Sequence, residues 1–334
     1  MKKYLLILIV ILLVGCNNSK KEKPRKKDNS KKIKIENKIE KNNYVSYNGN
    51  LKVKETNLVN QYDENIQLRG ISTHGIQWYF KFANKEVMSK LKDWGVNVFR
   101  IAMYTEENGY IANNSLKDKV KEIVEYAKEL DMYVIIDWHI LSDNNPNIHK
   151  EEAIKFFDEM ASTYKNTPNI IFEICNEPNG NTSWSEVKEY ALQIIPVIRK
   201  YSNNIIIVGT PTWSQDVDIA SLDKIDNNNI MYALHFYSGT HKEELRNKLD
   251  VALNNGIAIF VSEFGVSDAS GNGGVYLEEV TKWLDYLNSK NISWVNWSLS
   301  DKDESSALLL PNSDNNINEH LSESGKFIKE QIKR

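Results

Sequence analysis

Short apolar runs alternate with amphipathic stretches through most of the chain. Eight short runs are mainly apolar, and most of them are rich in Val and Ile, which predicts strands. They are Ile66–Ile71, Val96–Ala102, Tyr133–Trp138, Ile170–Cys175, Ile205–Val208, Met231–His235, Ile257–Ser262 and Ile292–Trp297. Apolar residues at helical spacing predict helices between and after them. These are Asn84–Trp94, Leu116–Leu130, Glu151–Tyr164, Ser185–Tyr201, Lys242–Asn254, Gly274–Leu287 and Leu321–Ile332, with the weakest pattern at Ser214–Asp223.

Apolar strands that alternate with helices predict a parallel sheet covered by helices, an α/β fold. Eight such units in about 290 residues fit a single closed (β/α)8 TIM barrel better than a doubly wound sheet. The sequence has no G-x-G-x-x-G after the first strand and no G-x-x-x-x-G-K-[ST], which argues against a nucleotide site. In such a barrel, functional residues lie at the carboxyl ends of the strands.

The first residues, MKKYLLILIVILLVGC, have the pattern of an export signal. Two lysines precede an apolar run, Tyr4–Val14, which is short for a membrane span. Leu13–Cys16 is similar to the lipobox of bacterial lipoproteins, which implies removal of residues 1–15 and lipidation of Cys16. We therefore expect an exported, membrane-anchored lipoprotein at the cell surface. An uncleaved membrane anchor is the alternative, and it also places the rest outside the cytoplasm.

Residues 16–42 are expected to be the lipidated cysteine and a disordered basic linker, followed by a catalytic domain at 43–334. Between Asn17 and Asn42 there are eleven basic and four acidic side chains, and few large apolar ones. The linker is either a plain spacer or attracted to anionic lipid or wall polymer. The linker therefore carries +7, and Lys2 and Lys3 add +2, so the whole-chain charge of −3 leaves −12 for the domain, which argues against nucleic acid as a partner. Cys175 is the only other cysteine and is expected to be a small buried apolar residue.

Polar and aromatic side chains occur at the ends of nearly all predicted strands. In strand order they are Ser72, His74 and Trp78; Arg100 and Tyr104; Asp137, Trp138 and His139; Asn176 and Glu177; Trp213; His235 and Tyr237; Glu263; and Trp297, followed by Lys302 and Glu304. One polar strand end would mean little, because exposed strand ends are usually polar. Polar residues at nearly every strand end are hard to explain as packing, so we expect them to form one site.

Glu177 and Glu263 are the pair of greatest interest. Their strands, the fourth and seventh, place them across the barrel, where two carboxylates could flank a glycosidic bond as donor of a proton and as nucleophile or base. Asn176 precedes Glu177, and strict alternation would send the two side chains to opposite faces. If both serve one site, the chain must leave regular β geometry there, and Pro178 is consistent with that.

Other candidates have more than one interpretation. Arg100 could hold a neighbouring carboxylate ionised or form a structural ion pair. His139 and His235 could orient the glutamates, contact sugar, or simply be hydrogen-bonded. With His74 and the glutamates they could also form a metal site, but no H-E-x-x-H or close pair of histidines supports this, so no metal or cofactor is expected.

Tryptophans indicate the class of substrate, since flat rings can stack on the apolar faces of pyranose rings. Trp78, Trp138, Trp213, Trp294 and Trp297 lie at or near the strand ends. Trp294 has the parity of a buried residue, whereas Trp78 and Trp297 are better candidates for binding. Lys302 and Glu304 could bind sugar hydroxyls or belong to a solvated charged loop.

An ordered set of motifs resembles glycoside hydrolase family 5, and within it the bacterial endoglucanases. The motifs are RGISTHGIQWY (Arg69–Tyr79), FRIAMY (Phe99–Tyr104), IIDWH (Ile135–His139), IFEICNEPNG (Ile171–Gly180), ALHFYSGTH (Ala233–His241), FVSEFGVSDASGNGG (Phe260–Gly274) and WVNWSLSDK (Trp294–Lys302). N-E-P alone is common in proteins, but the ordered set is specific. The resemblance implies a (β/α)8 barrel and a retaining double displacement.

The resemblance also implies a role for each matched residue. Glu177 matches the general acid/base and Glu263 the nucleophile. Arg100 and Tyr237 match residues that bind the nucleophile, and Asn176, with its histidine partners His139 and His235, matches the group that binds the 2-hydroxyl. His74, Trp78, Tyr104, Lys302 and Glu304 match binders on the glycone side, Trp297 the aromatic residue beneath the cleaved sugar, and Trp213 a platform on the leaving-group side.

The resulting expectation is a monomeric endo-β-1,4-glucanase that acts on cellulose or a related β-glucan. One alternative is an endo-hydrolase of mannan, xyloglucan or mixed-linkage glucan, because the family includes all of these. Another is a glycan-binding lipoprotein that has kept the cleft and lost turnover, although the presence of both glutamates and Arg100 argues against it.

Overall fold

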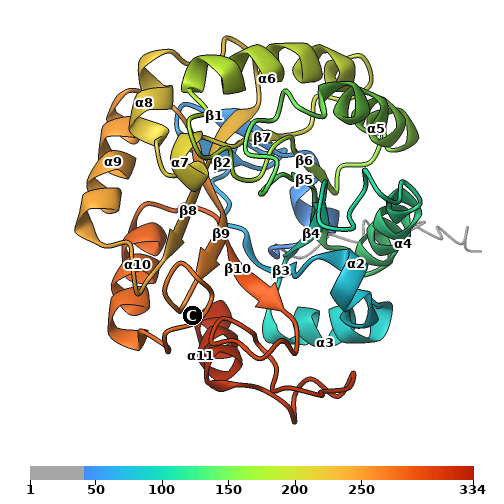
Figure 1. The fold of residues 1–334 in the computed structure, drawn as a ribbon, viewed down its shortest axis with the longest axis vertical. Helices are drawn as coiled ribbons and strands as arrows, with labels where there is room; N and C mark the ends of the chain where they lie inside the picture. Colours follow the sequence, from blue (N-terminus) through green and yellow to red (C-terminus); the bar gives the residue numbers. More distant parts are fainter. Residues whose placement is uncertain (1–40) are drawn as a thin grey trace, which may run out of the picture. The chain divides into compact units, whose positions relative to one another are not determined.

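A computed structural model describes residues 41–334. The predicted signal peptide, Cys16 and nearly all of the predicted linker lie outside the described residues. Eight parallel strands form a closed barrel in the order β10-β3-β4-β5-β6-β7-β8-β9 (Figure 1). They are β3 Arg69–Thr73, β4 Val98–Tyr104, β5 Tyr133–His139, β6 Ile170–Glu173, β7 Ile206–Val208, β8 Ile230–Tyr237, β9 Ile259–Gly265 and β10 Trp294–Leu299. The predicted (β/α)8 barrel is therefore confirmed.

Helices surround the barrel (Figure 1). They are α3 Lys85–Trp94, α4 Leu116–Glu129, α5 Lys150–Thr163, α6 Trp184–Arg199, α8 Val217–Leu222, α9 Glu243–Asn254, α10 Leu277–Ser289 and α11 Glu323–Lys333. Each lies within a few residues of a predicted helix, and the weakest predicted pattern corresponds to the six-residue α8. Within residues 41–334, none of the helices has the length and apolar character that crossing a membrane requires.

Local sequence signals explain where these helices begin and end. The Ser183 side chain accepts a hydrogen bond from the Glu186 backbone while the Glu186 side chain accepts from the Ser183 backbone, a capping box that begins α6. Asn84 caps the start of α3, because its side chain accepts a hydrogen bond from the Val87 N–H. Gly95 ends α3 with a φ of 109°, a conformation that glycine adopts readily.

Alternation along the strands separates two layers of the core. In β4, Phe99, Ile101 and Met103 pack outward against the helices, within a large cluster that includes the apolar faces of those helices. Val98 points inward and packs with inward residues of the other strands. Arg100 follows on this inner face, one layer closer to the carboxyl ends of the strands.

The segment before the barrel was not predicted. It contains α1 Val45–Asn48 and an antiparallel hairpin of β1 Lys52–Lys54 and β2 Asn57–Val59. Leu51 and Leu58 pack with the inner apolar cluster, so this segment covers the barrel's interior at the amino ends of its strands. These elements have three or four residues each, which is too short for hydrophobic periodicity to reveal. The short turns α2 Ile76–Tyr79, η1 Phe80–Phe82 and α7 Pro211–Ser214 were missed for the same reason.

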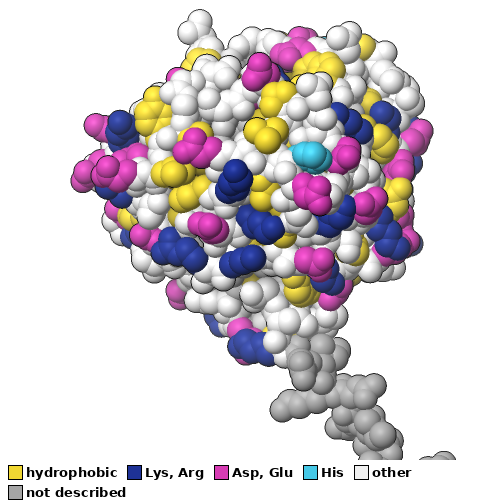
Figure 2. Space-filling view, turned by 90° about the horizontal axis from the view of Figure 1, so that it is seen from below, with side chains coloured by type: hydrophobic (Ala, Val, Ile, Leu, Met, Phe, Trp, Pro, Cys, Tyr) yellow, Lys and Arg dark blue, Asp and Glu magenta, His cyan; other side chains and the backbone are white. Residues whose placement is uncertain are grey.

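Figure 2 shows one side of the domain, where basic and acidic side chains are interspersed among small hydrophobic areas. A surface that binds nucleic acid usually gathers cations on one face or stripe. The charge on this face is mixed, with neither sign gathered into one patch.

Candidate active site

A cleft of about 1250 Å³ opens at the carboxyl ends of the strands. Twelve of the fourteen predicted barrel site residues line it: His74, Trp78, Tyr104, His139, Glu177, Trp213, His235, Tyr237, Glu263, Trp297, Lys302 and Glu304. The other two, Arg100 and Asn176, are fully buried and hydrogen-bonded to residues of the site. The structure therefore brings all fourteen together.

Glu177 reaches the site because β6 ends early. The strand was predicted to run to Cys175, but it ends at Glu173, and Asn176 and Glu177 both follow it in irregular backbone. The departure from β geometry that would allow both side chains to serve one site is thus observed. Oxygen atoms of Glu177 and Glu263 and a ring nitrogen of His235 lie within 4.8 Å of one another.

Glu263 points inward because β9 contains an irregularity in its pairing with β8. Ala233 pairs with Phe260, but His235 pairs with Glu263, so β9 has one extra residue between these positions. Because of this bulge, two residues three positions apart in the strand, here Phe260 and Glu263, face the same side of the sheet. Phe260 packs in the interior of the barrel, and Glu263 points into the cleft.

Both oxygens of the Glu263 carboxylate accept a hydrogen bond. Arg100 Nη1 donates to one at 3.0 Å and Tyr237 Oη donates to the other at 2.7 Å. Burial and the charge of Glu263 raise the pKa of Tyr237 well above its usual range, so the phenol keeps its proton. The carboxylate is therefore oriented and held by two donors.

Arg100 lies at the centre of a buried cluster of acids. Its guanidinium also contacts Glu173 at 2.7 Å, Asp137 at 3.0 Å and the side-chain oxygen Oδ1 of Asn176 at 2.7 Å. Burial alone would lower the pKa of Arg100, but the carboxylates around it outweigh this effect and raise the pKa. The pKa of Glu173 falls to about 2 because Arg100 and His235 outweigh its burial, whereas burial raises that of Asp137.

Replacing Arg100 by methionine is expected to lower the free energy of unfolding by about 3–5 kcal/mol, because buried carboxylates would lose their cation. Urea denaturation measures this loss. The matched control is Arg334→Met, which removes an exposed arginine at 2.7 Å from Asp285 and should cost no more than about 1 kcal/mol. Equal losses in the two variants would contradict the account of the buried cluster.

Asn176 is oriented through both ends of its amide. Its oxygen accepts from Arg100, and its nitrogen donates to the Ile140 carbonyl at 3.0 Å and to His139 Nε2 at 3.3 Å. Burial, together with nearby Arg100, lowers the pKa of His139 to about 3, so the ring is neutral. Its Nδ1 donates to Asp137 at 2.6 Å, which leaves Nε2 as an acceptor.

His235 is hydrogen-bonded to Glu177. The Ser262 hydroxyl donates to Glu173 at 2.6 Å, so its oxygen accepts from His235 Nε2 at 2.9 Å. The other ring nitrogen lies 2.9 Å from Glu177 Oε1. Burial lowers the pKa of His235, but the carboxylates of Glu173, at 3.7 Å, and Glu177, at 2.9 Å, outweigh it and raise the pKa to about 9. His235 therefore stays protonated at neutral pH, and its Nδ1–H donates to Glu177.

This pKa predicts how stability depends on pH. In an unfolded chain the pKa of histidine is about 6.5, whereas in the folded protein that of His235 is about 9. Below pH 6.5 both states are protonated and the stabilisation is fully present. As pH rises from 6.5 to 9, only the folded state keeps the proton, so the free energy of unfolding should fall by up to about 3 kcal/mol. Denaturation across this range should give a shallower decline for His235→Gln; the same decline in both proteins would refute the prediction.

Aromatic rings line one side of the cleft. The ring of His74 lies 4.9 Å from Trp297 and 5.8 Å from Trp78, and Tyr104 lies 5.1 Å from Trp78. Burial lowers the pKa of His74 to about 3, so this ring is also neutral. Trp78 is 44% exposed, whereas Trp297 is buried at the base of the cleft. Trp294 is fully buried, as predicted.

The loop after β10 adds a charged pair to this aromatic wall. Lys302 Nζ lies 2.6 Å from Glu304 Oε2, and the Glu304 side chain is almost completely buried. Both residues line the cleft, and the Lys302 side chain is also exposed to solvent. Trp213 lies in α7, after β7, and β7 is four strands from β3 around the barrel of eight. The cleft therefore has exposed aromatic rings on opposite sides of the glutamates.

Two buried residues beneath the site, Glu173 and Ser262, were not predicted as part of it, and a third, Asp137, was predicted without a role. Asp137 had been noted only as a polar strand end. A sequence signal existed for Glu173, since a carboxylate within the apolar run Ile170–Cys175 needs a buried partner. Ser262 carries no such signal, because a serine can bond its own backbone.

Glu177, His235 and Glu263 also have the spacing of a metal-binding group. Their donor atoms are already engaged, however. Arg100 and Tyr237 donate hydrogen bonds to the two carboxylate oxygens of Glu263. The ring nitrogens of His235 are hydrogen-bonded to Ser262 and Glu177. The guanidinium 3.0 Å from Glu263 would also repel a second cation. These residues therefore fit a proton-transfer site better than a metal site.

Comparisons with known proteins agree with this geometry. Residues 59–303 match the family model described as cellulase (glycosyl hydrolase family 5). The chain is 56% identical over 295 residues to an endoglucanase of Clostridium saccharobutylicum, covering 86% of this chain and 66% of the relative. It is 55% identical over 275 residues to endoglucanase A of Evansella cellulosilytica, covering 80% of this chain and 56% of that relative. The chain thus spans less than two thirds of the length of these relatives.

Solved structures are similar as well. The structure of cellulase Cel5C_n has a TM-score of 0.85 and 45% identity, covering 87% of this chain and 94% of that chain. A variant of the Thermobifida fusca endoglucanase Cel5A catalytic domain, in complex with cellotetraose, has a TM-score of 0.84 and 32% identity, covering 87% and 99%. With the family model matching most of its length, the chain belongs to glycosyl hydrolase family 5.

Proposed function

We propose that this chain is a retaining endo-β-1,4-glucanase that cleaves internal bonds of cellulose or a related β-glucan. The observation that carries the proposal is the pair of carboxylates whose oxygens lie within 4.8 Å of each other in an open cleft. Retaining enzymes have carboxyl groups about 5–5.5 Å apart, and inverting enzymes need about 6.5–9.5 Å to admit a water. The relatives named endoglucanases, and the one bound to cellotetraose, support the choice of substrate.

In the first step, Glu263 attacks the anomeric carbon while Glu177 donates its proton to the leaving oxygen. Arg100 and Tyr237 keep the Glu263 carboxylate oriented for the attack. Asn176 is held where it can bond the hydroxyl next to the anomeric carbon. In the second step, Glu177, now ionised, takes a proton from water, which attacks the glycosyl ester and restores the original configuration. Because oxygens of Glu177 and Glu263 lie within 4.8 Å of each other, the bell-shaped pH dependence of the rate should belong to this pair of carboxyl groups and not to single residues.

The polymer can be identified by assaying the full chain on carboxymethylcellulose, lichenan and mannan side by side. The proposal predicts a fall in the viscosity of carboxymethylcellulose that precedes extensive release of reducing ends, because aromatic rings on both sides of the glutamates favour internal binding. Greater activity on mannan than on carboxymethylcellulose would instead favour the related endo-hydrolases. Binding of cello-oligosaccharide with no release of reducing ends would favour a binding protein.

The location of the protein is a separate proposal. We infer from MKKYLLILIVILLVGC and the basic stretch after it that the protein is exported and held at the cell surface by lipid on Cys16. Growth with a labelled fatty acid should label the wild-type protein and not Cys16→Ser. Equal labelling of the two would refute lipidation at this cysteine.

A further inference from the structure

The turn that carries Trp213 has an unusual backbone. Thr212, Trp213 and Ser214 have φ values of 56°, 55° and 56°, in the left-handed region. None of them is glycine, and residues with a side chain avoid this region. Three such residues in succession persist only where surrounding contacts hold them. The contacts of the turn therefore show what fixes the Trp213 ring.

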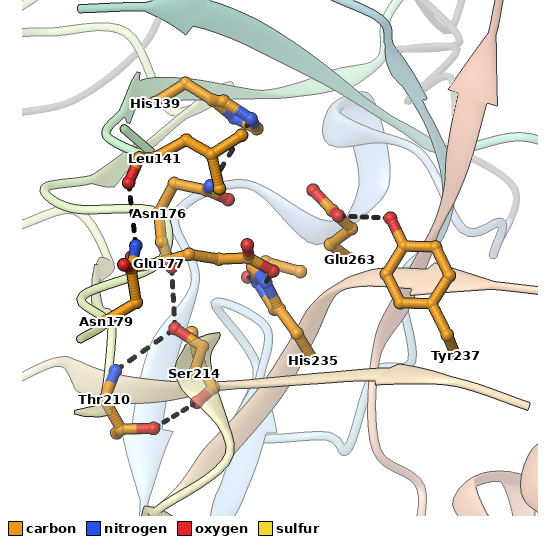
Figure 3. A network of polar contacts seen from close by, with 12 residues as sticks. His139, Leu141, Asn176, Glu177, Asn179, Thr210, Ser214, His235, Tyr237 and Glu263 are labelled. Carbon is orange, nitrogen blue, oxygen red and sulfur yellow. Dashed lines mark hydrogen bonds and ion pairs between the residues drawn. The ribbon is translucent and has the colours of Figure 1, made fainter. Parts of the chain in front are cut away.

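Ser214 provides the principal contact. It is fully buried, and its hydroxyl donates to the Asn176 carbonyl at 2.6 Å and accepts from the Thr210 N–H at 3.2 Å (Figure 3). The Trp213 N–H also donates to the Pro178 carbonyl at 3.0 Å. These bonds join the turn after β7 to the segment after β6 that carries the proposed acid.

The two sides of this junction are anchored unequally. Asn176 is held independently by its N–H, which donates to Trp138 O at 3.1 Å, and by its amide, which bonds Ile140 O at 3.0 Å and Arg100 at 2.7 Å. The turn relies on Ser214 for its side-chain contact with this segment. Loss of the Ser214 hydroxyl should therefore release the turn and leave the segment that carries the acid in place.

A released turn would change one part of the cleft. Trp213 is 45% exposed and lines the cleft on the side of β7, away from the His74 and Trp78 wall. We propose that Ser214 is a positioning residue that fixes the Trp213 ring relative to Glu177 and so determines binding of sugars on the leaving-group side. This inference rests on the proposed function, because it assumes that the cleft binds a glucan chain on both sides of the glutamates.

The test compares two substrates of the full chain. Cellopentaose places sugars on both sides of the cleaved bond, whereas dinitrophenyl β-cellobioside has sugars only on the glycone side and a leaving group that needs little protonation. Ser214→Ala is expected to lower kcat/KM on cellopentaose about tenfold, mainly by raising KM, since one hydrogen bond is worth about that factor. The rate on the aryl cellobioside should stay within about twofold. A double-mutant cycle adds a second readout, because Trp213→Ala with Ser214→Ala should be no worse than Trp213→Ala alone.

Two further variants separate the hydroxyl from other effects. Ser214→Gly also lacks the hydroxyl but tolerates a positive φ, so it should show the same split between substrates even if Ser214→Ala folds poorly. Ser221→Ala in α8 is the matched control, because this buried serine bonds Asp218 O at 2.5 Å, away from the cleft. It should leave both rates unchanged.

The outcomes distinguish the two proposals. Equal losses on both substrates, or additive losses in the double mutant, would overturn the role of Ser214 while leaving the proposed function intact. A wild-type protein that cleaves neither substrate would overturn both.

Discussion

Replacing Glu263 by glutamine is expected to lower kcat on carboxymethylcellulose by at least about 1,000-fold, which corresponds to about 4 kcal/mol of transition-state stabilisation. An amide cannot form the glycosyl ester, so the covalent route is lost. The fold should be retained, because the amide can keep both partners of the carboxylate. Its oxygen can accept from Arg100, and its nitrogen can donate to the Tyr237 hydroxyl, which is able to accept.

Initial rates of reducing-sugar release measure this effect, with thermal melting as a check on folding. The matched control is Glu278→Gln on α10, which neutralises an exposed glutamate at 2.8 Å from Lys282 and should leave the rate unchanged. A Glu263→Gln variant that melts normally and keeps a near-native rate would exclude Glu263 as the nucleophile.

Glutamine in place of Glu177 is expected to lower kcat on the polymer by about 100- to 10,000-fold, the usual contribution of a general acid or base. The loss should depend on the leaving group. Dinitrophenolate leaves without protonation, so formation of the glycosyl enzyme from a dinitrophenyl cellobioside should remain fast, and its hydrolysis should become limiting. A burst of dinitrophenol in rapid-mixing experiments would report this change of step.

Azide provides a second measurement on Glu177→Ala. The smaller side chain leaves room for azide, which needs no general base to attack the glycosyl enzyme. Turnover should rise with azide concentration and give β-cellobiosyl azide, the product of net retention. No acceleration, or an α-azide, would argue against Glu177 as the acid/base.

Much of the fold was predictable because its elements are long enough to be periodic. Strands such as Tyr133–His139 begin with a continuous apolar run, here Tyr133 to Ile136, and helices such as Leu116–Glu129 present a clear apolar stripe. The hairpin of β1 and β2 was missed because three residues define no period. The left-handed turn at Thr212–Ser214 was missed because non-glycine residues carry no signal for a positive φ.

The residues that face the cleft were predictable, since strand ends in a barrel converge and the family motifs match them. The buried residues that hold these side chains in place were harder to predict. Glu173, Asp137 and Ser262 act through hydrogen bonds between strands that are distant in sequence, and their partners are visible only in three dimensions. The extra residue in β9 that turns Glu263 inward could not be read from the sequence, because it is defined by pairing with β8.

In the proposed mechanism, Glu263 forms a covalent bond to the sugar, while Glu177 first donates a proton and then accepts one. Trapping of the glycosyl enzyme measures this bond. The protein is incubated with a dinitrophenyl fluoro-cellobioside, from which the glycosyl enzyme forms faster than it is hydrolysed. The masses of the digested peptides are then measured by mass spectrometry. We expect one fluoro-cellobiosyl group on the peptide that contains Glu263, and no labelled peptide in Glu263→Gln. A label on another residue, or turnover on cellulose that yields the α-anomer as first product, would contradict it.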